Sequence, residues 1–363
     1  MTTETPVLVR SPAADLPVLH QIVLPTPWDI GPVQIYVVEG DPLTLIDTGV
    51  RRDNARAALE AAFEELGLEL AQIRRVVLTH YHTDHMGQVA TLRDAGADFE
   101  LLVHQDDADD VEQFSVEREE RIEESNRLFA EHGVPIDLLA RQAGRIRREV
   151  AGNPPLALAA RVDRRLRDGE RLPFKDFELE VLHAPGHTAG HIVLAERRSG
   201  VLLTGDHLMG NAVPFTESFD LSERPDAADP VGRRPRFRGL PSYLASLRRL
   251  RAGGFRCILP AHGGILDRPA RVIDEAMLFY EVRVQRVERI AARIAAERGD
   301  ASAWEIWQQL FPKLDPDTQM RTRMVMVIGA LDVLEDQGRV TPHRRADGTL
   351  AFRPLADASP TRT

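Results

Sequence analysis

Three histidines and an aspartate lie within six residues of this 363-residue chain, in the segment Thr79-His80-Tyr81-His82-Thr83-Asp84-His85. A short apolar run, residues 76–78, precedes the segment and is typical of a buried strand. Placing so many polar side chains beside a core is costly unless they bind a ligand. Imidazole nitrogens and a carboxylate oxygen, with no sulfur, suit Zn(II) and also Fe(II), Mn(II) or Co(II). The segment therefore predicts a metal site.

The spacing within the segment favours two metal ions over one. His80 and His82 alternate in an extended turn, so their imidazoles are expected on the same side of the chain. Asp84 and His85 then fall toward a second position.

Three further apolar runs end in turns that carry histidine or aspartate. Val181-Leu182 precedes His183 to His187, Leu202-Leu203 precedes Gly205-Asp206, and Ile258-Leu259 precedes Ala261-His262. Ligand sites in layered α/β proteins lie beyond strand ends, so we expect these turns and the first segment to converge on one edge.

The elements that must position these turns are strands and helices read from apolar periodicity and from Gly and Pro punctuation. A helix is expected from Ala55 to Leu66, closed by Gly67, and another from Pro241 to Arg251. The expected strands are residues 21–24, 33–39, 43–47, 177–182, 192–195, 201–203 and 257–259.

Two regions differ in character from this pattern. Residues 105–155 carry charge-rich helical patterns, at 111–132 and 136–150, and form an expected helical insert that is either a lid or a structural excursion. From residue 269 the pattern is a long helix, a short helix opened by the capping box Ser302 to Glu305, a third helix from Asp315-Pro316, and a hairpin at 339–354. This is the order of a winged helix, and it predicts two domains, residues 1–268 and 269–363.

Composition excludes several classes of protein. The net charge of −10 argues against a general polyanion binder, and the single cysteine, Cys257, excludes an internal disulfide framework. The first 16 residues lack a basic segment followed by an apolar one, and no uncharged apolar run reaches about 18 residues. We expect a cytoplasmic protein that does not bind membranes.

The histidine-rich segment and its companions resemble the motifs of the metallo-β-lactamase superfamily. His80-x-His82-x-Asp84-His85 is similar to the family signature, and four further motifs occur in order: Leu45 to Gly49, Pro185 to His191, Leu203 to His207, and Leu259 to Gly263. The resemblance implies an α/β fold, a four-layer αββα sandwich with its metal site at the edge between two sheets.

Carried over residue by residue, the resemblance implies two divalent metal ions, with zinc as first choice and iron or manganese as alternatives. His80, His82 and His187 would hold the first ion, Asp84, His85 and His262 the second, and Asp206 would bridge both. Asp47 and His191 are expected to orient ligands by hydrogen bonds. His20, His132 and His343 stand alone and are expected on the surface, and His104 is expected to be an ordinary histidine or a substrate contact.

The implied chemistry is hydrolysis by a metal-bridging hydroxide, with Asp84 as the catalytic carboxylate that orients the water or carries its proton. The motifs around Asp206 and His262 are similar to those of glyoxalase II and of thioesterase-like or lactonase-like members, so the leading substrate is a small acyl ester, thioester or lactone. A run of arginines could bind a substrate anion: Arg233, Arg234, Arg236 and Arg238.

Two other functions stay open. Some superfamily members with a C-terminal winged helix resemble RNA-cleaving enzymes, so an endoribonuclease acting on single-stranded RNA is the alternative, although basic and acidic residues are balanced from Arg271 onward. A non-enzymatic regulator is the other, and the complete ligand set argues against it. The C-terminal domain is more simply a packing or homodimerisation module.

Overall fold

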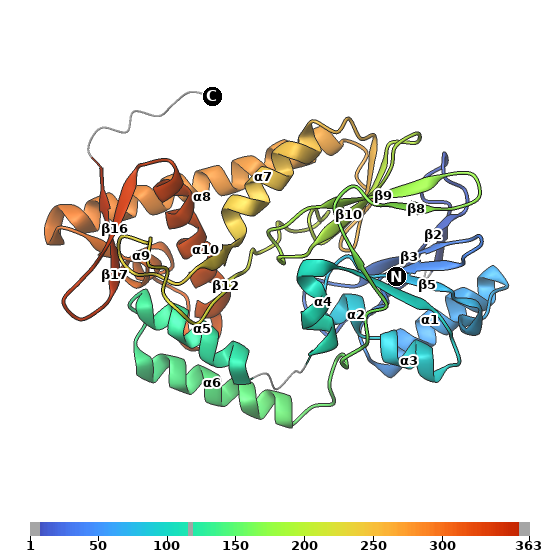
Figure 1. The fold of residues 1–363 in the computed structure, drawn as a ribbon, viewed down its shortest axis with the longest axis horizontal. Coiled ribbons are helices and arrows are strands. Elements are labelled where there is room, and N and C mark those ends of the chain that lie inside the picture. The colour runs from blue at the N-terminus through green and yellow to red at the C-terminus, as the bar shows by residue number, and fades with distance from the viewer. Residues whose placement is uncertain (1–7, 115–118, 356–363) are drawn as a thin grey trace. The chain divides into compact units, whose positions relative to one another are not determined.

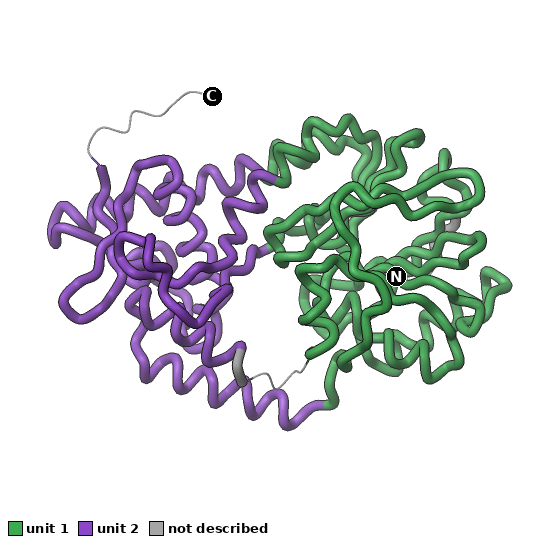
Figure 2. Tube along the Cα trace, in the orientation of Figure 1, with its two compact units in different colours: residues 1–116, 154–214, 246–276 green, residues 117–153, 215–245, 277–363 purple. Residues whose placement is uncertain are grey.

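The computed structural model describes residues 8–114 and 119–355 (Figure 1). The predicted helical stretch 111–132 includes residues 115–118, which lie outside the described part. Contacts divide the chain into two compact units, shown in Figure 2. Unit 1 comprises residues 1–116, 154–214 and 246–276, and unit 2 comprises residues 117–153, 215–245 and 277–363. The expected division at residue 268 groups the chain differently, because the insert and residues 215–245 belong with the C-terminal region.

Unit 1 contains two β-sheets that face each other. The first has seven strands in sequential order: β1 Leu8–Arg10, β2 Leu19–Leu24, β3 Val33–Val38, β4 Thr44–Ile46, β5 Arg75–Val77, β6 Glu100–His104 and β7 Arg164–Leu166. The second has the order β14-β11-β10-β9-β8, with β8 Arg171–Pro173, β9 Glu178–His183, β10 Ile192–Glu196, β11 Val201–Gly205 and β14 Cys257–Pro260. Strands β4 to β7 run parallel, as do β11 and β14.

Alternating side chains of the first sheet build two separate cores. Tyr36, Ile46 and Val77 point to one face, where they pack with residues of the second sheet such as Leu194 and Leu203. Their chain neighbours, including Ile35, Leu45 and Val76, point to the opposite face and pack under helices α1 Asp53–Leu66, α3 Val89–Asp94 and α4 Gln105–Glu112. Because successive strand residues face opposite sides, one continuous apolar run serves both cores.

Most elements predicted from periodicity are present. Helix α1 ends at Gly67, whose φ of 72° is the left-handed conformation that glycine adopts most readily. A 3-10 turn at Leu70–Gln72 and the short helix α2 Thr83–Met86 complete the elements of this part of unit 1. Helices α7 Gly239–Arg251 and α8 Pro269–Arg298 contribute residues to both units.

Unit 2 joins the helical insert to the C-terminal region. Its elements are α5 Glu119–Glu131, α6 Ile136–Ala151, β12 Ser218–Asp220, β13 Arg236–Arg238, β15 Ala301–Ser302, α9 Ala303–Leu310, α10 Pro316–Asp336, β16 Val340–Arg344 and β17 Leu350–Pro354. Ser302 and Glu305 form the predicted capping box of α9, and Asp315 caps α10. The insert packs on α10, since Gln142 Nε2 donates to Pro316 O at 2.6 Å and Arg141 pairs with Asp317 at 3.0 Å. Among the described residues, no helix is long and apolar enough to span a bilayer.

Candidate metal centre

The turn after β5 presents the histidine-rich segment at the carboxyl ends of the parallel strands. His82 precedes the one-turn helix α2, and its carbonyl accepts from the amides of His85 and Met86, both at 3.0 Å. Thr48 fixes the other side of the turn, because its amide and hydroxyl donate to the His85 carbonyl at 2.6 and 2.7 Å. Asp84 and His85 are thereby held against the end of β4.

Asp47 orients the turn from a strained backbone conformation, with φ at +58°. Its Oδ1 accepts from the Thr79 amide and its Oδ2 from the Thr79 hydroxyl, each at 2.8 Å. Oδ2 also lies 2.8 Å from His85 Nδ1. A proton on Nδ1 that is donated to this carboxylate leaves the lone pair of His85 on Nε2, facing the site.

Asp206 follows β11 and lies between the two groups of histidines. Its Oδ2 is 3.4 Å from His187 Nε2, whereas its Oδ1 is 3.3 Å from His85 Nε2 and 3.6 Å from His262 Nε2. The Asp206 amide donates to His191 Nε2 at 3.2 Å, so His191 supports the backbone of Asp206. Gly205 is required before it, because a Cβ there would lie 2.7 Å from Thr79 Oγ1.

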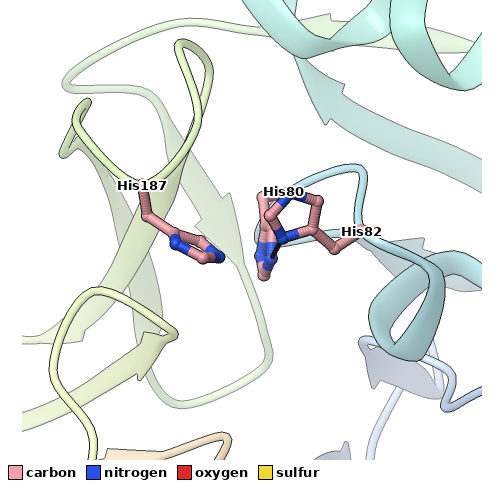
Figure 3. Close-up of side chains that lie close together, drawn as sticks. All are labelled: His80, His82 and His187. Atoms are coloured by element: carbon pink, nitrogen blue, oxygen red, sulfur yellow. Dashed lines mark hydrogen bonds between the residues drawn. The ribbon is translucent and has the colours of Figure 1, made fainter. Parts of the chain in front are cut away.

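The structure brings all seven expected ligands together at this edge. Three sets of side chains have ligand atoms within 4.8 Å of one another: His80, His82 and His187; Asp84, His85 and His262; and His80, His85 and Asp206. Figure 3 shows the first set, in which His80 and His82 from one loop face His187 from another. The first two sets correspond to the two expected metal positions. Asp206, in the third set, lies where a bridging ligand is expected.

The chemistry of the facing atoms fits metal ions. His85 Nε2 and Asp206 Oδ1 are buried and make no hydrogen bond within the described chain, although they lie 3.3 Å apart. With Nδ1–H directed at Asp47, both atoms are acceptors, so a proton or a metal ion must lie between them. Other histidine nitrogens and carboxylate oxygens with lone pairs lie nearby. A metal ion can bind several of these atoms at once, whereas a single proton cannot, so the cluster favours a metal ion.

Protonation preferences agree with this view. Burial, reinforced by the neighbouring His85, lowers the pKa of His80 well below its usual value, which keeps that imidazole neutral. Burial would raise the pKa of Asp206, but His85 and His187 outweigh burial and hold the pKa well below the usual range. For His85 burial would lower the pKa, yet Asp47, Asp206 and Asp84 raise it well above the usual value. A site that attracts a proton this strongly also attracts a cation.

Asp107 supports the loop that carries His187, and it was missed by sequence reasoning. The side chain is fully buried, and it accepts from the Thr188 hydroxyl at 2.7 Å and from the Gly190 amide. A Cβ at Gly190 would lie 2.4 Å from the Asp107 amide, so only glycine allows this approach. Its position four residues after the apolar run at residues 101–103 was the available signal, but the charge-rich segment around it suggested a structural excursion.

The remaining histidines lie outside the seven-residue set. His104 caps α4 by accepting from the Asp106 amide at 3.3 Å, and its ring stacks on His183 at 3.9 Å. His20 and His132 were expected on the surface, and that prediction is wrong. His20 is buried beside Glu39 at 2.7 Å, and His132 is buried with Nδ1 2.8 Å from Leu128 O.

The arginine run has partners inside unit 2. Each guanidinium meets a carboxylate of α5 or α10: Arg233 with Glu335 at 2.7 Å, Arg234 with Glu131 at 2.8 Å, Arg236 with Asp332 at 2.9 Å, and Arg238 with Asp336 at 2.8 Å. Binding of a substrate anion by these arginines stays a prediction, and it would have to compete with these ion pairs.

The fold is a mixed α/β architecture of two facing sheets, and a histidine- and aspartate-rich candidate metal site lies beyond the strand ends. Residues 28–262 match the family model of the metallo-beta-lactamase superfamily, and the chain belongs to that superfamily.

Known proteins resemble the chain over different lengths. It is 29% identical over 343 residues to "Probable metallo-hydrolase YqjP" of Bacillus subtilis, covering 94% of this chain and 96% of that protein. The hydroxyacylglutathione hydrolase GloC of Haemophilus influenzae is 32% identical over 155 residues, 42% of this chain and 57% of that one. The crystal structure of the metallo-beta-lactamase family protein TTHA1429 from Thermus thermophilus matches with a TM-score of 0.70 and 27% identity, covering 93% of this chain and 99% of that one.

Proposed function

We propose that the protein is a hydrolase that holds two divalent metal ions, zinc as first choice, and cleaves an acyl ester, thioester or lactone. The observation that carries the proposal is the convergence of seven nitrogen and oxygen ligands at one sheet edge, with two buried acceptor atoms 3.3 Å apart. When bound, such ions supply an activated water and polarise the scissile carbonyl oxygen.

The chain's own residues supply orientation and proton transfer. Asp84 Oδ2 lies 3.2 Å from His262 Nε2, and Oδ1 lies 3.8 Å from His85 Nε2. These distances support Asp84 as the carboxylate that we propose to orient the attacking water and accept its proton. Asp47 and Asp107 fix the two loops that carry His85 and His187.

The proposed acyl substrate class is supported by the similarity to GloC and by the nitrogen and oxygen ligands of the site. GloC is named for hydrolysis of a hydroxyacylglutathione, and it shares 32% identity with this chain over 155 residues. Two arginines of the C-terminal hairpin, where a winged helix could contact RNA, have partners within unit 2. Arg345 pairs with Asp300 at 2.5 Å and with Glu305 at 2.8 Å, and Arg344 donates to Val231 O at 2.8 Å. An acyl substrate therefore has more support than RNA.

We also propose that the C-terminal part of unit 2 is a winged helix used for packing. Three helices, α8, α9 and α10, are followed by the β16–β17 hairpin, and β15 adds to β17. The third helix carries Asp332, Glu335 and Asp336, which bind the arginines of residues 233–238. A helix whose charged face is neutralised in this way is poorly suited to contact phosphates.

The test is a substrate panel with metal-loaded protein that spans thioesters, esters, lactones, β-lactams, phosphodiesters and labelled single-stranded RNA. We expect turnover of an acyl substrate, loss of turnover in His187→Asn, and unchanged turnover in Glu39→Gln. Glu39 is the matched control because it pairs with the buried His20 at 2.7 Å, outside the expected ligand set. Cleavage of RNA without any acyl turnover would support the endoribonuclease instead, and operator binding without turnover would support the regulator.

A further inference from the structure

Unit 2 contains a cavity of about 220 Å³ between α5, residues 215–219 and α10. Its walls are mainly apolar and include Phe129, Phe215, Phe219 and Val325. The volume lies below the roughly 300–1,000 Å³ of drug-sized ligand sites, so a ligand would be a small molecule.

The half-buried guanidinium of Arg321 faces this cavity. Arg321 of α10 donates from Nη1 to Ser125 Oγ at 2.7 Å and from Nη2 to Asn126 Oδ1. Its Nε is buried without a hydrogen bond, and its guanidinium carbon lies 5.6 Å from the centre of the Phe129 ring. Burial, and to a lesser extent the positive charge of the nearby Arg145, lowers the pKa of Arg321 to about 10. The guanidinium therefore still carries its charge at neutral pH.

Within the described residues, Arg321 lacks the counter-ion that each arginine of the run at residues 233–238 has. In the portion of the chain that the structure describes, Arg321 makes no ion pair, whereas Arg233 and Arg236 each bind a carboxylate of the same helix. Arg121, Glu124 and Glu217 also line the cavity, and each already interacts with other groups. A partly buried charge without a counter-ion is unfavourable, and an anion in the cavity would relieve that cost.

We propose that this cavity binds a small organic carboxylate with an aromatic body, of the size of phenylacetate. The carboxylate would accept from the Arg321 guanidinium, which is suited to planar anions, and the ring would pack among the phenylalanine side chains. The site is separate from the metal ligands and does not depend on the proposed hydrolysis.

The test uses 4-fluorophenylacetate as the probe and ¹⁹F NMR line broadening of the full-length, metal-loaded protein. The neutral 4-fluorophenylacetamide tests the need for charge, and acetate as a competitor tests the need for the ring. We expect Arg321→Gln to weaken binding of 4-fluorophenylacetate at least about tenfold, because hydrogen bonds to charged groups contribute this much. The matched control is Arg323→Gln on the same helix, since Arg323 donates to Gln319 O at 3.4 Å and does not line the cavity.

The carboxylate of the probe can also bind the metal ions of the loaded protein. The test therefore depends on the difference in affinity for 4-fluorophenylacetate between wild type and the variants. Equal affinity in wild type and in a folded Arg321→Gln variant would overturn the proposal, as would equal binding of the amide. Should Arg321→Gln fail to fold, Val325→Phe fills the cavity and leaves Arg321 in place. Loss of binding in Val325→Phe supports the site, and retained binding refutes it.

Discussion

Asp47→Asn is the substitution that most sharply tests how the metal site is oriented. The Asp47 carboxylate accepts three hydrogen bonds, from the Thr79 amide, the Thr79 hydroxyl and His85 Nδ1, each at 2.8 Å. Asparagine has one acceptor oxygen, so it can serve the Thr79 amide or the His85 imidazole but not both. When the oxygen serves the amide, the new NH₂ faces His85 Nδ1 and moves the ring proton to Nε2.

That tautomer places a proton on the atom that lies 3.3 Å from Asp206 Oδ1, where a metal ion is expected. Loss of a carboxylate that orients a ligand imidazole costs about 10- to 100-fold in metal affinity, or roughly 1.4 to 2.7 kcal/mol. Competition titration of zinc against a chromogenic chelator measures this change.

The matched control is Glu39→Gln, because Glu39 pairs with the buried His20 at 2.7 Å outside the site. We expect zinc affinity in the control to stay within about twofold of wild type, since an imidazole that binds no metal is affected. Wild-type zinc affinity in a folded Asp47→Asn variant would refute the reasoning.

Three other substitutions test separate parts of the structure. Asp107→Ala should lower metal affinity about 10- to 100-fold, because it frees the loop that carries His187. The control Asp109→Ala, which breaks an exposed pair with Arg165, should leave metal affinity unchanged. Equal metal affinities in the two variants would contradict this role of Asp107. Asp332→Ala should lower the free energy of unfolding by about 3 to 5 kcal/mol, because it leaves Arg236 buried without its carboxylate; Glu275→Ala, at an exposed pair, is the control in urea denaturation. Burial, and to a lesser extent Arg236, lowers the pKa of His132 to about 3, whereas the ordinary pKa of histidine is about 6.5. Between these two pH values only the unfolded state takes up the proton. The free energy of unfolding therefore falls by up to about 1.4 kcal/mol per pH unit as the pH is lowered from 6.5 toward 3. His132→Phe should therefore lose less stability than wild type between pH 7 and pH 5, and an identical loss in both would exclude this origin.

The sequence predicted the edge of the fold that carries the site because the information is local there. Each expected ligand lies just beyond an apolar strand, and parallel strands bring such turns to the same edge. The caps of α9 and α10 were predicted for the same reason, since Ser302 and Asp315 act on residues two or three positions away.

Features that depend on distant packing were not predictable in this way. Arg236 donates a hydrogen bond to Asp332, 96 residues later, and Arg321 donates one to Ser125 in the insert. Local sequence patterns therefore predict neither which segments form unit 2 nor which carboxylates pair with the arginine run. His132 was expected on the surface because no other candidate ligand lies near it in the chain, and Asp107 lies in a charge-rich segment, yet tertiary packing buries both.

Metal stoichiometry tests the central claim most directly. Protein loaded with Zn(II), Fe(II) or Mn(II) under reducing conditions, dialysed and measured by elemental analysis, should retain two divalent ions per chain. His187→Asn and His262→Asn should each lower that number, whereas Glu39→Gln should not. A wild-type protein that retains none of the three metals, or variants that retain as much as wild type, would contradict the account.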